Sequence, residues 1–408
     1  MRKRIYLLLI QLLLVFIFSG CCKEPLQTAC TREEPSCRQL YPDDSRPEQQ
    51  PEPVIAAWIP YFTVAELLSA GNADQAAADI YSYLQRLRET GINTVFVHVC
   101  AFGETVYPSA YYPMLPAADG LDVMRLFSDS CRELGLSFHA WINPLRLQTS
   151  EYMEAQKDGS LLQTWYRDPA LRKERLSEWD GRFYLNPAAE STGTFLTDAL
   201  TELIVNHHPD GIHIDDYFYP TAETAFDAAE FSASGADDLF IWRRGNITKL
   251  MQRINTAVHA ADHDIVFSVS PQGNMSENQN KQFADVPAWL TETPVCDWII
   301  PQLYFGYQNE TAPYAQLLRE WTTLPGNDHV RLIIGLAAYK VGETDPFAGS
   351  GSEEWQTAEA ILAKQAADAL GESNVSGIAF YHADALLALP ENEMQALQST
   401  ISAGNLKQ

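Results

Sequence analysis

The feature that most constrains the fold of this chain is a regular alternation of short apolar segments with helical stretches. Eight segments have the length and composition of strands: 56–61, 93–99, 137–143, 211–217, 264–270, 297–304, 331–339 and 377–382. Helices are expected at 73–89, 121–134, 191–206, 240–260, 314–321, 354–369 and 391–401. Repeated strand–helix units build parallel sheets, and eight of them predict an α/β fold, the (β/α)₈ TIM barrel. One barrel with insertions also fits the length of 408 residues and the apolar content of 46%.

Two connections in this pattern are long, and both follow the carboxyl end of a strand. They run from 144 to 184, after the third strand, and from 220 to about 238, after the fourth. Active sites of barrels lie at this end, and long loops in a compact domain are usually functional. We therefore expect both loops to overhang the site. The first contains four aromatic residues that either stack on sugars or pack the loop down: Trp165, Tyr166, Trp179 and Tyr184.

The fourth expected strand separates apolar from polar side chains most clearly. Ile212 and Ile214 have one parity, whereas His213, Asp215 and Tyr217 have the other. Successive side chains of a strand point to opposite faces. In a barrel the apolar parity packs against the helices and the other parity points inward, where residues near the mouth do the chemistry. Asp215 is therefore expected at the bottom of a substrate cleft.

A second carboxylate, Asp216, follows Asp215 directly, and the two are the candidate catalytic residues. Glycosidic cleavage uses two carboxyl roles around an oxocarbenium-like transition state, usually with one group kept protonated. Neighbours on a straight strand diverge. Asp215 therefore acts either with a carboxylate from elsewhere, such as Glu104, or with Asp216 if the chain curls after Ile214. In the second case the like-charged neighbour raises one pKa, and the N-acetyl group of the substrate can take the place of a second protein nucleophile.

Polar and aromatic side chains also end most of the other strands, although barrel interiors otherwise favour Val, Ile and Leu. Hydrogen-bonding groups interleaved with Trp and Tyr suit a sugar, which has an apolar ring face and hydroxyl edges. The same parity puts Cys100 on the side of His98. Further inward groups are Ser268, Ser270 and Tyr381. The candidate substrate-binding residues are His98, Glu104, His139, Trp141, Asn143, Arg146, His213, Tyr217, Tyr219, Gln272, Gln302, Tyr304 and Tyr339.

Eight short motifs follow one another between Val54 and His382. They are GINTVFVH (91–98), HAWINP (139–144), YLNP (184–187), DGIHIDDYFY (210–219), WRRGN (242–246), SVSPQGN (268–274), PQLY (301–304) and GLAAYK (335–340). In this order they resemble the glycosyl-hydrolase-like 10 family.

The resemblance implies a TIM-barrel protein of the bacterial envelope, often a lipoprotein. It also implies hydrolysis of glycan strands, with peptidoglycan as the leading substrate. The Asp-Asp-Tyr-Phe motif of the family falls on residues 215–218. Members often have Arg-Pro where this chain has Cys100-Ala101, and Gly-Asp where it has Gly103-Glu104. The subsite near the second strand is therefore expected to differ.

The amino-terminal segment has the pattern of a secretion signal. Three basic residues precede an apolar run that ends at Phe18 and is too short for an ordinary membrane-spanning helix. The residues up to Cys21 resemble a bacterial lipobox, and the alternative is a plain cleaved signal. We expect a signal peptide at 1–20, a flexible spacer at 21–53 and the barrel at 54–404. The protein would then be secreted and anchored through a lipid on Cys21 to the outer face of a bacterial membrane.

Charge and cysteine content bear on other classes of protein. A net charge of −25 argues against nucleic acid as a partner, because phosphates require a basic surface. The seven cysteines include no Cys-x-x-Cys pair and so give no metal signature. Cys30 and Cys37 can pair in an oxidising compartment, whereas Cys100, Cys131 and Cys296 are expected to be buried single thiols. We expect a monomer that uses no cofactor and no metal and has a glycan as its substrate.

Two other functions fit parts of the pattern. Three histidines share the inward parity with Asp215, and imidazole with carboxylate suits zinc, as in a metal-dependent hydrolase. The residues concerned are His98, His139 and His213, none of which has the i, i+4 spacing of helical ligands. The other alternative is a non-catalytic glycan-binding lipoprotein on the same barrel, because a fold does not determine function.

Overall fold

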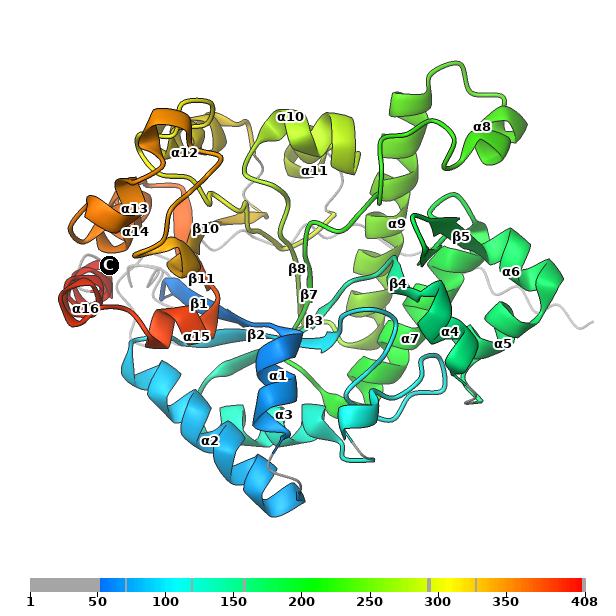
Figure 1. Cartoon of the computed structure of the whole chain (residues 1–408), viewed down its shortest axis with the longest axis horizontal. Helices are drawn as coiled ribbons and strands as arrows, with labels where there is room; N and C mark the ends of the chain where they lie inside the picture. The colour runs from blue at the N-terminus through cyan, green and yellow to red at the C-terminus, as the bar shows by residue number, and fades with distance from the viewer. Residues whose placement is uncertain are drawn as a thin grey trace, which may run out of the picture. The chain divides into compact units, whose positions relative to one another are not determined.

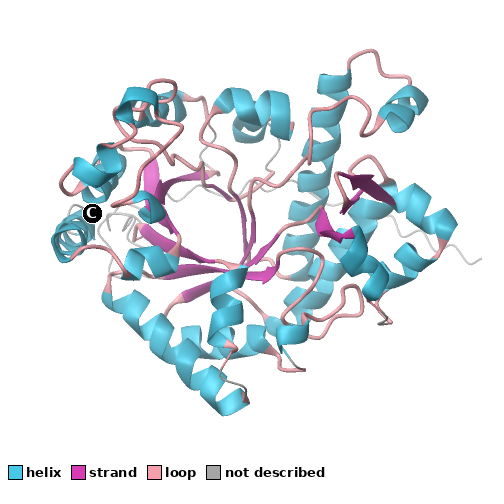
Figure 2. Ribbon diagram, viewed as in Figure 1, coloured by secondary structure: helices cyan, strands magenta, loops and turns pink. Residues whose placement is uncertain are grey.

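The computed structural model describes residues 52–69, 72–118, 120–156, 159–291, 295–326 and 329–405. In the unit formed by Pro51–Gln408, eight parallel strands close into a barrel in the order β1-β11-β10-β9-β8-β7-β3-β2 (Figures 1 and 2). The strands are β1 (Val54–Ile59), β2 (Thr94–Cys100), β3 (Ser137–Ile142), β7 (Gly211–Ile214), β8 (Val266–Val269), β9 (Trp298–Ile299), β10 (Arg331–Ala337) and β11 (Val375–Tyr381). The expected (β/α)₈ barrel is confirmed.

Some of these strands end earlier at the mouth than the sequence predicts. β7 ends at Ile214 and β9 at Ile299, three and five residues short of the expected ends. The Ser270 amide still donates to the Ile214 carbonyl at 2.8 Å, and Gln302 forms isolated bridges with Gln272, beyond the end of β8, and with Gly335 of β10. The residues beyond these points leave the regular ladder, so their side chains are no longer governed by strand parity.

Helices surround the barrel (Figure 2). The longer helices are α2 (Ala73–Glu89), α3 (Val123–Leu134), α7 (Glu190–His207), α9 (Leu239–Ala261), α12 (Tyr314–Thr323), α14 (Ile361–Leu370) and α16 (Glu391–Asn405). Shorter ones are α1 (Tyr61–Leu67), α8 (Ala228–Ser234), α10 (Met275–Glu277), α11 (Val286–Thr291), α13 (Glu354–Thr357) and α15 (Ala383–Leu387). Helix α3 shows how the local sequence sets the ends of a helix. Asp122 caps its start by accepting a hydrogen bond from the Arg125 amide at 3.1 Å, and Gly135 ends it at a φ of 68°.

The core has two layers, one between strands and helices and one inside the barrel. The inner layer consists mainly of Val54, Ala56, Trp58, Phe96, Trp141, Trp298, Ile300, Ile333 and Ala379. These side chains fill the interior, as in other TIM barrels, so the barrel is a packed core and not a pore. A ligand can therefore contact only the groups at the mouth of the barrel.

The first long loop is an ordered insertion after β3 (Figure 1). It contains β4 (Arg146–Thr149), α4 (Ser150–Ala155), α5 (Leu161–Arg167), α6 (Pro169–Arg175), β5 (Leu176–Trp179) and β6 (Arg182–Leu185). The strands form an antiparallel sheet in the order β4-β6-β5. Asp180 and Gly181, with φ of 48° and 71°, make the tight turn between β5 and β6. Trp165 and Tyr166 are each 4% exposed, so they pack the insertion down.

Cys100, Cys131 and Cys296 are buried free thiols, which confirms the sequence prediction for them. The expected signal peptide, Cys21, the proposed Cys30–Cys37 pair and nearly all of the spacer lie outside the described residues. Across the residues that are described, no helix combines the length and the apolar character needed to span a bilayer.

Candidate active site

The floor of the mouth is a hydrogen-bonded layer around His213 of β7. The Trp58 indole N–H donates to His213 Nε2 at 2.8 Å, and His213 Nδ1 lies 2.8 Å from Ser268 Oγ. Because Nε2 accepts, Nδ1 carries the proton and donates to Ser268. Burial lowers the pKa of His213 well below its ordinary value, so the ring is neutral. Both ring nitrogens are engaged, so neither is free to bind substrate, and His213 instead supports the site from below. The sequence had suggested His213 as a substrate-binding residue.

Directly above this layer the chain turns, and both carboxylates enter the mouth. The Tyr217 amide donates to Asp215 Oδ1 at 3.3 Å, and the Phe218 amide donates to the Asp216 carbonyl at 3.1 Å. The Asp216 carboxylate accepts a hydrogen bond from Gln272 Nε2, which follows β8. Of the two arrangements left open by the sequence, the structure has the curled chain with the two aspartates together.

Asp215 and Asp216 form a tightly coupled acidic pair. Burial raises the pKa of Asp215 well above its ordinary value and the charge of Asp216 raises it further, while the Tyr217 amide opposes the shift. Burial also raises the pKa of Asp216, against the side-chain amides of Gln272 and Gln302. Two adjacent carboxyls with raised pKa values do not both ionise readily, so the pair holds its last proton more tightly than an isolated aspartate does. Between its two ionisations, the pair offers one carboxylic acid and one carboxylate.

Tyrosine rings line the mouth around this pair. Tyr304 and Tyr381 stack with centroids 5.8 Å apart, and Tyr339 meets Tyr381 edge-on at 5.8 Å. Burial, and next the charge of Asp215, raises the pKa of Tyr381, because its hydroxyl lies within the field of that carboxylate. The mouth thus presents apolar ring faces together with hydroxyl groups.

A second aromatic wall comes from the neighbouring strands β2 and β3. The rings of His98 and Trp141 are parallel, with centroids 3.7 Å apart, and each residue is 4% exposed. Burial lowers the pKa of His98 to about 3, so its ring is neutral. Asn143 donates from Nδ2 to the Ala101 carbonyl at 3.1 Å and holds the loop after β2. Because His98 covers one face of Trp141, little of the indole is free to meet a sugar.

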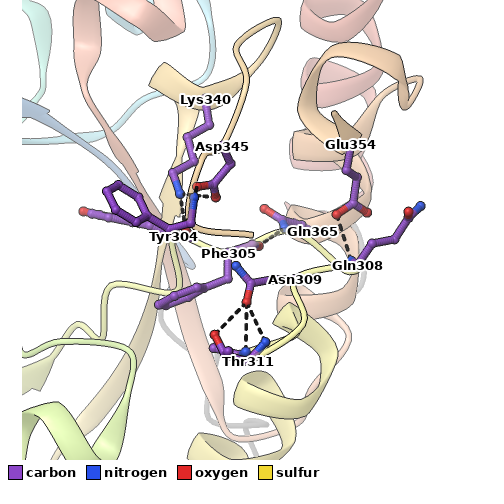
Figure 3. Close-up of polar contacts among 11 residues, drawn as sticks. Tyr304, Phe305, Gln308, Asn309, Thr311, Lys340, Asp345, Glu354 and Gln365 are labelled. Carbon is purple, nitrogen blue, oxygen red and sulfur yellow. Dashed lines mark hydrogen bonds and ion pairs between the residues drawn. The ribbon is translucent and has the colours of Figure 1, made fainter. Parts of the chain in front are cut away.

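A buried ion pair fixes the loop of Tyr304 from behind (Figure 3). Lys340 Nζ donates to the Tyr304 carbonyl at 2.8 Å and pairs with Asp345 Oδ2 at 2.6 Å. Further along the same loop, the Gln308 amide donates to Glu354 Oε2 at 2.8 Å. These contacts join the loops after β9 and β10. The tyrosine wall is therefore held in place before any ligand binds.

Arg146, the first residue of β4, lies at the rim of the mouth. Its guanidinium carbon is 4.5 Å from the ring centre of Tyr217, which is 44% exposed. Its positive charge lowers the pKa of both Asp215 and Asp216, against the larger effect of burial. Arg146 is thus within electrostatic reach of the acidic pair, and its expected role in binding substrate stays a prediction.

Two expected binding residues lie away from the mouth. His139 is fully buried one layer below, stacked on Trp298 at 5.0 Å and meeting Phe96 edge-on at 5.3 Å. Tyr219 lies beyond the turn, is 4% exposed and has the guanidinium of Arg243 at 5.2 Å over its ring. The structure therefore removes both from the residues that a ligand at the mouth can reach. Strand parity gave the direction of His139 but not its depth, and it does not extend to Tyr219.

Two residues of the loop after β2 also depart from expectation. Glu104, 6% exposed, accepts hydrogen bonds from Gln148 Nε2 at 2.6 Å and from the Tyr152 hydroxyl. It ties the insertion to this loop, and the carboxyl whose charge acts on Asp215 is that of Asp216. A register shift between His98 and Cys100 moves Cys100 to the outward parity. The expected position of Cys100 beside His98 is wrong because of this bulge.

Several mouth residues were not expected from the sequence. Tyr61 and Phe62 begin α1 directly after β1 and are 44% and 43% exposed. Tyr61 meets Phe102 edge-on at 5.0 Å, and Phe62 meets His382 at 5.3 Å. The guanidinium carbon of Arg182 lies 5.1 Å from the centre of the same Phe102 ring. Position just after a strand end is the one signal that could have identified Tyr61 and Phe62.

The inward histidines do not converge on a common point for a metal. His213 is bonded to Trp58 and Ser268, while His139 and His98 are each stacked on a tryptophan. Within the described ranges, no group of three or more His, Cys, Asp or Glu side chains is arranged to hold a metal ion. The zinc-hydrolase alternative therefore has no ligand set in this part of the chain.

Fold and site together define a class of protein. A closed parallel barrel with a coupled carboxyl pair at its mouth, surrounded by tyrosine and tryptophan, is the arrangement of TIM-barrel glycoside hydrolases. Residues 56–350 match the family model described as Glycosyl hydrolase-like 10, and the chain belongs to this family. This membership confirms the enzyme class expected from the sequence, a glycoside hydrolase.

The chain is similar to other proteins of this class. It is 27% identical to Glycosyl hydrolase DigH of Escherichia coli (strain K12), over 78% of this chain and 81% of that protein. It is also 27% identical to Glycosyl hydrolase YngK of Bacillus subtilis (strain 168), over 67% and 58% of the two chains. The solved PgaB (BpsB) glycoside hydrolase domain from Bordetella bronchiseptica has a TM-score of 0.57 at 14% identity, covering 86% of this chain and 99% of that one. The catalytic domain of a beta-amylase from Paenibacillus polymyxa has a TM-score of 0.53 at 12% identity, covering 86% and 98%. These structural likenesses concern the barrel fold.

Proposed function

We propose that this protein hydrolyses O-glycosidic bonds in a cell-envelope glycan, and that peptidoglycan glycan strands are its substrate. Asp215 and Asp216 are the proposed catalytic pair. One observation carries the proposal: two adjacent carboxyls with raised pKa values lie together at the mouth of the barrel. The names of the related proteins, both glycosyl hydrolases, support the reaction class. The motif resemblance supports the choice of peptidoglycan.

Asp215 is the proposed general acid. It is the more deeply buried of the two, and its pKa is raised well above the ordinary value. Its protonated form therefore persists to higher pH than that of an ordinary aspartate and can donate a proton to the leaving glycosidic oxygen. The carboxylate that results can then accept a proton from the attacking water.

Asp216 is the proposed carboxylate of the pair. The amides of Gln272 and Gln302 favour its charged form. A negative charge held here stabilises the positive charge that develops at the anomeric carbon. Asp216 does this either by facing the sugar directly or by orienting an N-acetyl group of the substrate as the nucleophile.

The tyrosine wall is the proposed platform for the sugar rings. Tyr339 is 38% exposed, and Tyr304 and Tyr381 stack beside it. A pyranose has an apolar face that packs on such rings and hydroxyl edges that bond to polar neighbours. Gln302 and Arg146 lie within reach of Asp216 and can serve as those neighbours.

A non-catalytic glycan-binding protein is the second candidate, and one observation favours it. Asp215 is only 4% exposed in the structure. A carboxyl so enclosed reaches a glycosidic oxygen only if the substrate enters deeply between the rings. Binding without hydrolysis would follow if the substrate stopped at the exposed tyrosines.

Digestion of purified peptidoglycan and of a neutral glucan, with products identified by mass spectrometry, tests the proposal. The full-length wild type is compared with Asp215→Asn, Asp216→Asn and the control Asp264→Asn, whose side chain is 97% exposed. Wild type and control should release peptidoglycan fragments, and the two catalytic variants should not. Measurable binding by the wild type with no product from any glycan would favour the second candidate.

We also propose that the protein is secreted and held at the outer face of a bacterial membrane by a lipid on Cys21. The lipobox-like residues before Cys21 support this location. In fractionated cells, Cys21→Ser should move the protein from the membrane to the soluble fraction, while the neighbouring Cys22→Ser should leave it in place. Retention of Cys21→Ser in the membrane fraction would contradict the anchor.

A further inference from the structure

The small sheet of the insertion has two different faces. Directly opposed residues of antiparallel strands share a face. The register pairs Trp179 with Arg182 and Arg146 with Tyr184, so these four side chains lie on one face. Phe183, of opposite parity, is buried against helix α5 on the other face. The first face therefore combines two cations with two aromatic rings.

The two kinds of side chain on this face have different contacts. Both aromatic rings pack edge-on against Phe226, with centroids 6.1 and 6.3 Å away. The arginines instead converge on the loop after β2. The guanidinium carbons of Arg146 and Arg182 each lie 5.1 Å from the ring centre of Phe102. Two cations thus share one aromatic ring at the rim of the mouth.

Neither of these two charges is neutralised by an ion pair within the described residues. Burial, and next the charge of Arg146, lowers the pKa of Arg182. Arg243 elsewhere pairs with Asp227, but among the described residues neither Arg146 nor Arg182 forms an ion pair. This holds although the chain has 53 Asp and Glu residues against 28 Lys and Arg. Burial raises the pKa of Asp215 and of Asp216, so this acidic pair resists carrying two negative charges.

We infer that Arg146 and Arg182 form a carboxylate-binding subsite over Phe102, so the substrate is an acidic saccharide. This inference rests on the proposed function and adds the substrate class. Guanidinium groups match carboxylates through paired, charge-assisted hydrogen bonds. Both guanidinium carbons lie 5.1 Å from the centre of the Phe102 ring, which brings the two cations together at one place.

The position of the subsite places the bound carboxylate beside the reacting bond. Arg146 contacts Tyr217, only two residues beyond Asp215. Arg182 is oriented by one of its own donors, since its Nη1 donates to the Leu147 carbonyl at 2.6 Å. Its remaining donors are then available to a ligand. An acidic group on the sugar at or next to the scissile linkage can therefore meet both arginines.

Two kinds of sugar carry such a group: those with a lactyl ether, as in muramic acid, and the uronic acids. Calorimetric titration of the full-length protein distinguishes them. The probes are a muramyl oligosaccharide with free carboxylates, the same oligosaccharide with its carboxylates converted to methylamides, an oligosaccharide containing glucuronate, and a neutral N-acetylglucosamine oligomer. The proteins are wild type, Arg182→Gln and the control Arg125→Gln, whose side chain on α3 is 75% exposed.

The wild type and Arg125→Gln should bind at least one carboxylate probe roughly 10-fold or more tightly than its neutral counterpart, as expected for hydrogen bonds between ions. Arg182→Gln should lose most of that preference and bind the neutral probes as the wild type does. The preferred carboxylate probe identifies the sugar. Equal binding of acidic and neutral probes by the wild type, or an unchanged preference in Arg182→Gln, overturns the inference.

Binding is measured without turnover, so this test separates the subsite from the proposed reaction. A carboxylate preference in a protein that cleaves no glycan would leave the subsite standing and refute the hydrolase mechanism. Cleavage of acidic and neutral glycans alike, with no effect of Arg182→Gln, would support the hydrolase mechanism and refute the carboxylate-binding subsite.

Discussion

Gln272, just past the end of β8, donates a hydrogen bond from Nε2 to Oδ2 of Asp216, just past the end of β7. The bond joins the ends of two adjacent strands at the mouth. A hydrogen bond from the side-chain amide of Gln302 also favours the charged form of Asp216. Asp215 lies deeper, where burial dominates. This difference is the basis on which we propose the acid role for Asp215 and the carboxylate role for Asp216.

Removing the Gln272 amide should make Asp216 harder to ionise. The donor lowers the pKa of Asp216, so Gln272→Ala raises it, and the acid limb of the kcat/KM profile moves to higher pH. We expect a shift of about one pH unit, because a hydrogen bond to a charged group contributes roughly 1.5 kcal/mol. Gln316→Ala, at an exposed position of α12, is the matched control. An acid limb that stays in place in Gln272→Ala would disprove the coupling.

Asp215→Asn should stabilise the fold while it removes activity. Because the folded-state pKa of Asp215 is raised, its stabilising contribution is fully present below the ordinary aspartate pKa and is lost as pH rises through the folded value. Asparagine cannot ionise, so the variant does not lose stability in this way as the pH rises. Thermal unfolding at pH 8 should show a higher Tm for the variant, by roughly 1–3 kcal/mol in free energy. At pH 4 the difference should shrink, and a difference independent of pH would argue against a buried, protonated Asp215.

Tyr339→Ala should weaken substrate binding more than it slows turnover. The ring is 38% exposed at the mouth, and aromatic stacking contributes roughly 0.5–1.5 kcal/mol, so KM should rise about 2- to 10-fold with kcat nearly unchanged. Tyr339→Phe keeps the ring and should behave like the wild type. A matched fall of kcat and kcat/KM in Tyr339→Ala would instead place the tyrosine in the transition state.

Trp141→Ala should mainly lower the stability of the fold, whereas Tyr339→Ala should mainly weaken substrate binding. The sequence suggests that Trp141 stacks on the sugar, but its ring is covered by His98 and is 4% exposed. The substitution therefore opens a cavity, and loss of a buried indole destabilises a fold by roughly 3–5 kcal/mol. Denaturant unfolding should report this loss. A wild-type unfolding midpoint together with a large rise in KM would restore the stacking role.

Lys340→Met should loosen the wall that carries Tyr304. Asp345, 3% exposed, would be left without its partner, and breaking a buried ion pair in this way lowers stability by roughly 3–5 kcal/mol. We expect a lower Tm and a higher KM. The double variant Lys340→Met with Asp345→Asn removes the stranded charge and should recover part of the Tm but not the KM. If the double variant were no more stable than the single one, the ion pair would not be the cause.

The barrel and the place of Asp215 at the end of the fourth strand were predictable because they depend on local pattern, whereas the turn that brings Asp216 beside it was left open. In β7 every residue up to Ile214 lies in the ladder, so alternation gave the direction of His213 and brought Asp215 to the mouth. The same rule failed at Cys100, where a bulge shifts the register, and at Tyr219, which lies beyond the turn. Alternation holds only as far as the strand continues.

Depth and long-range pairing were not predictable. His139 has the inward parity, but its register places it opposite Gly211 at the start of β7, below the mouth. Arg146 follows the third strand directly and was expected. Arg182 was not, because its position depends on the pairing of β4 with β6 inside a long loop. Such contacts between distant residues leave no periodic signal in the sequence.

Steady-state hydrolysis of purified glycan strands by the wild type, Asp215→Asn and Asp216→Asn tests the proposed catalytic pair most directly. Each carboxyl should act on transition-state charge, so kcat should fall by roughly 10²- to 10⁴-fold in either variant while KM changes by less than about threefold. The exposed control Asp264→Asn should retain wild-type kinetics. Wild-type turnover in both variants, or a loss confined to KM, would show that the two aspartates do not catalyse the reaction.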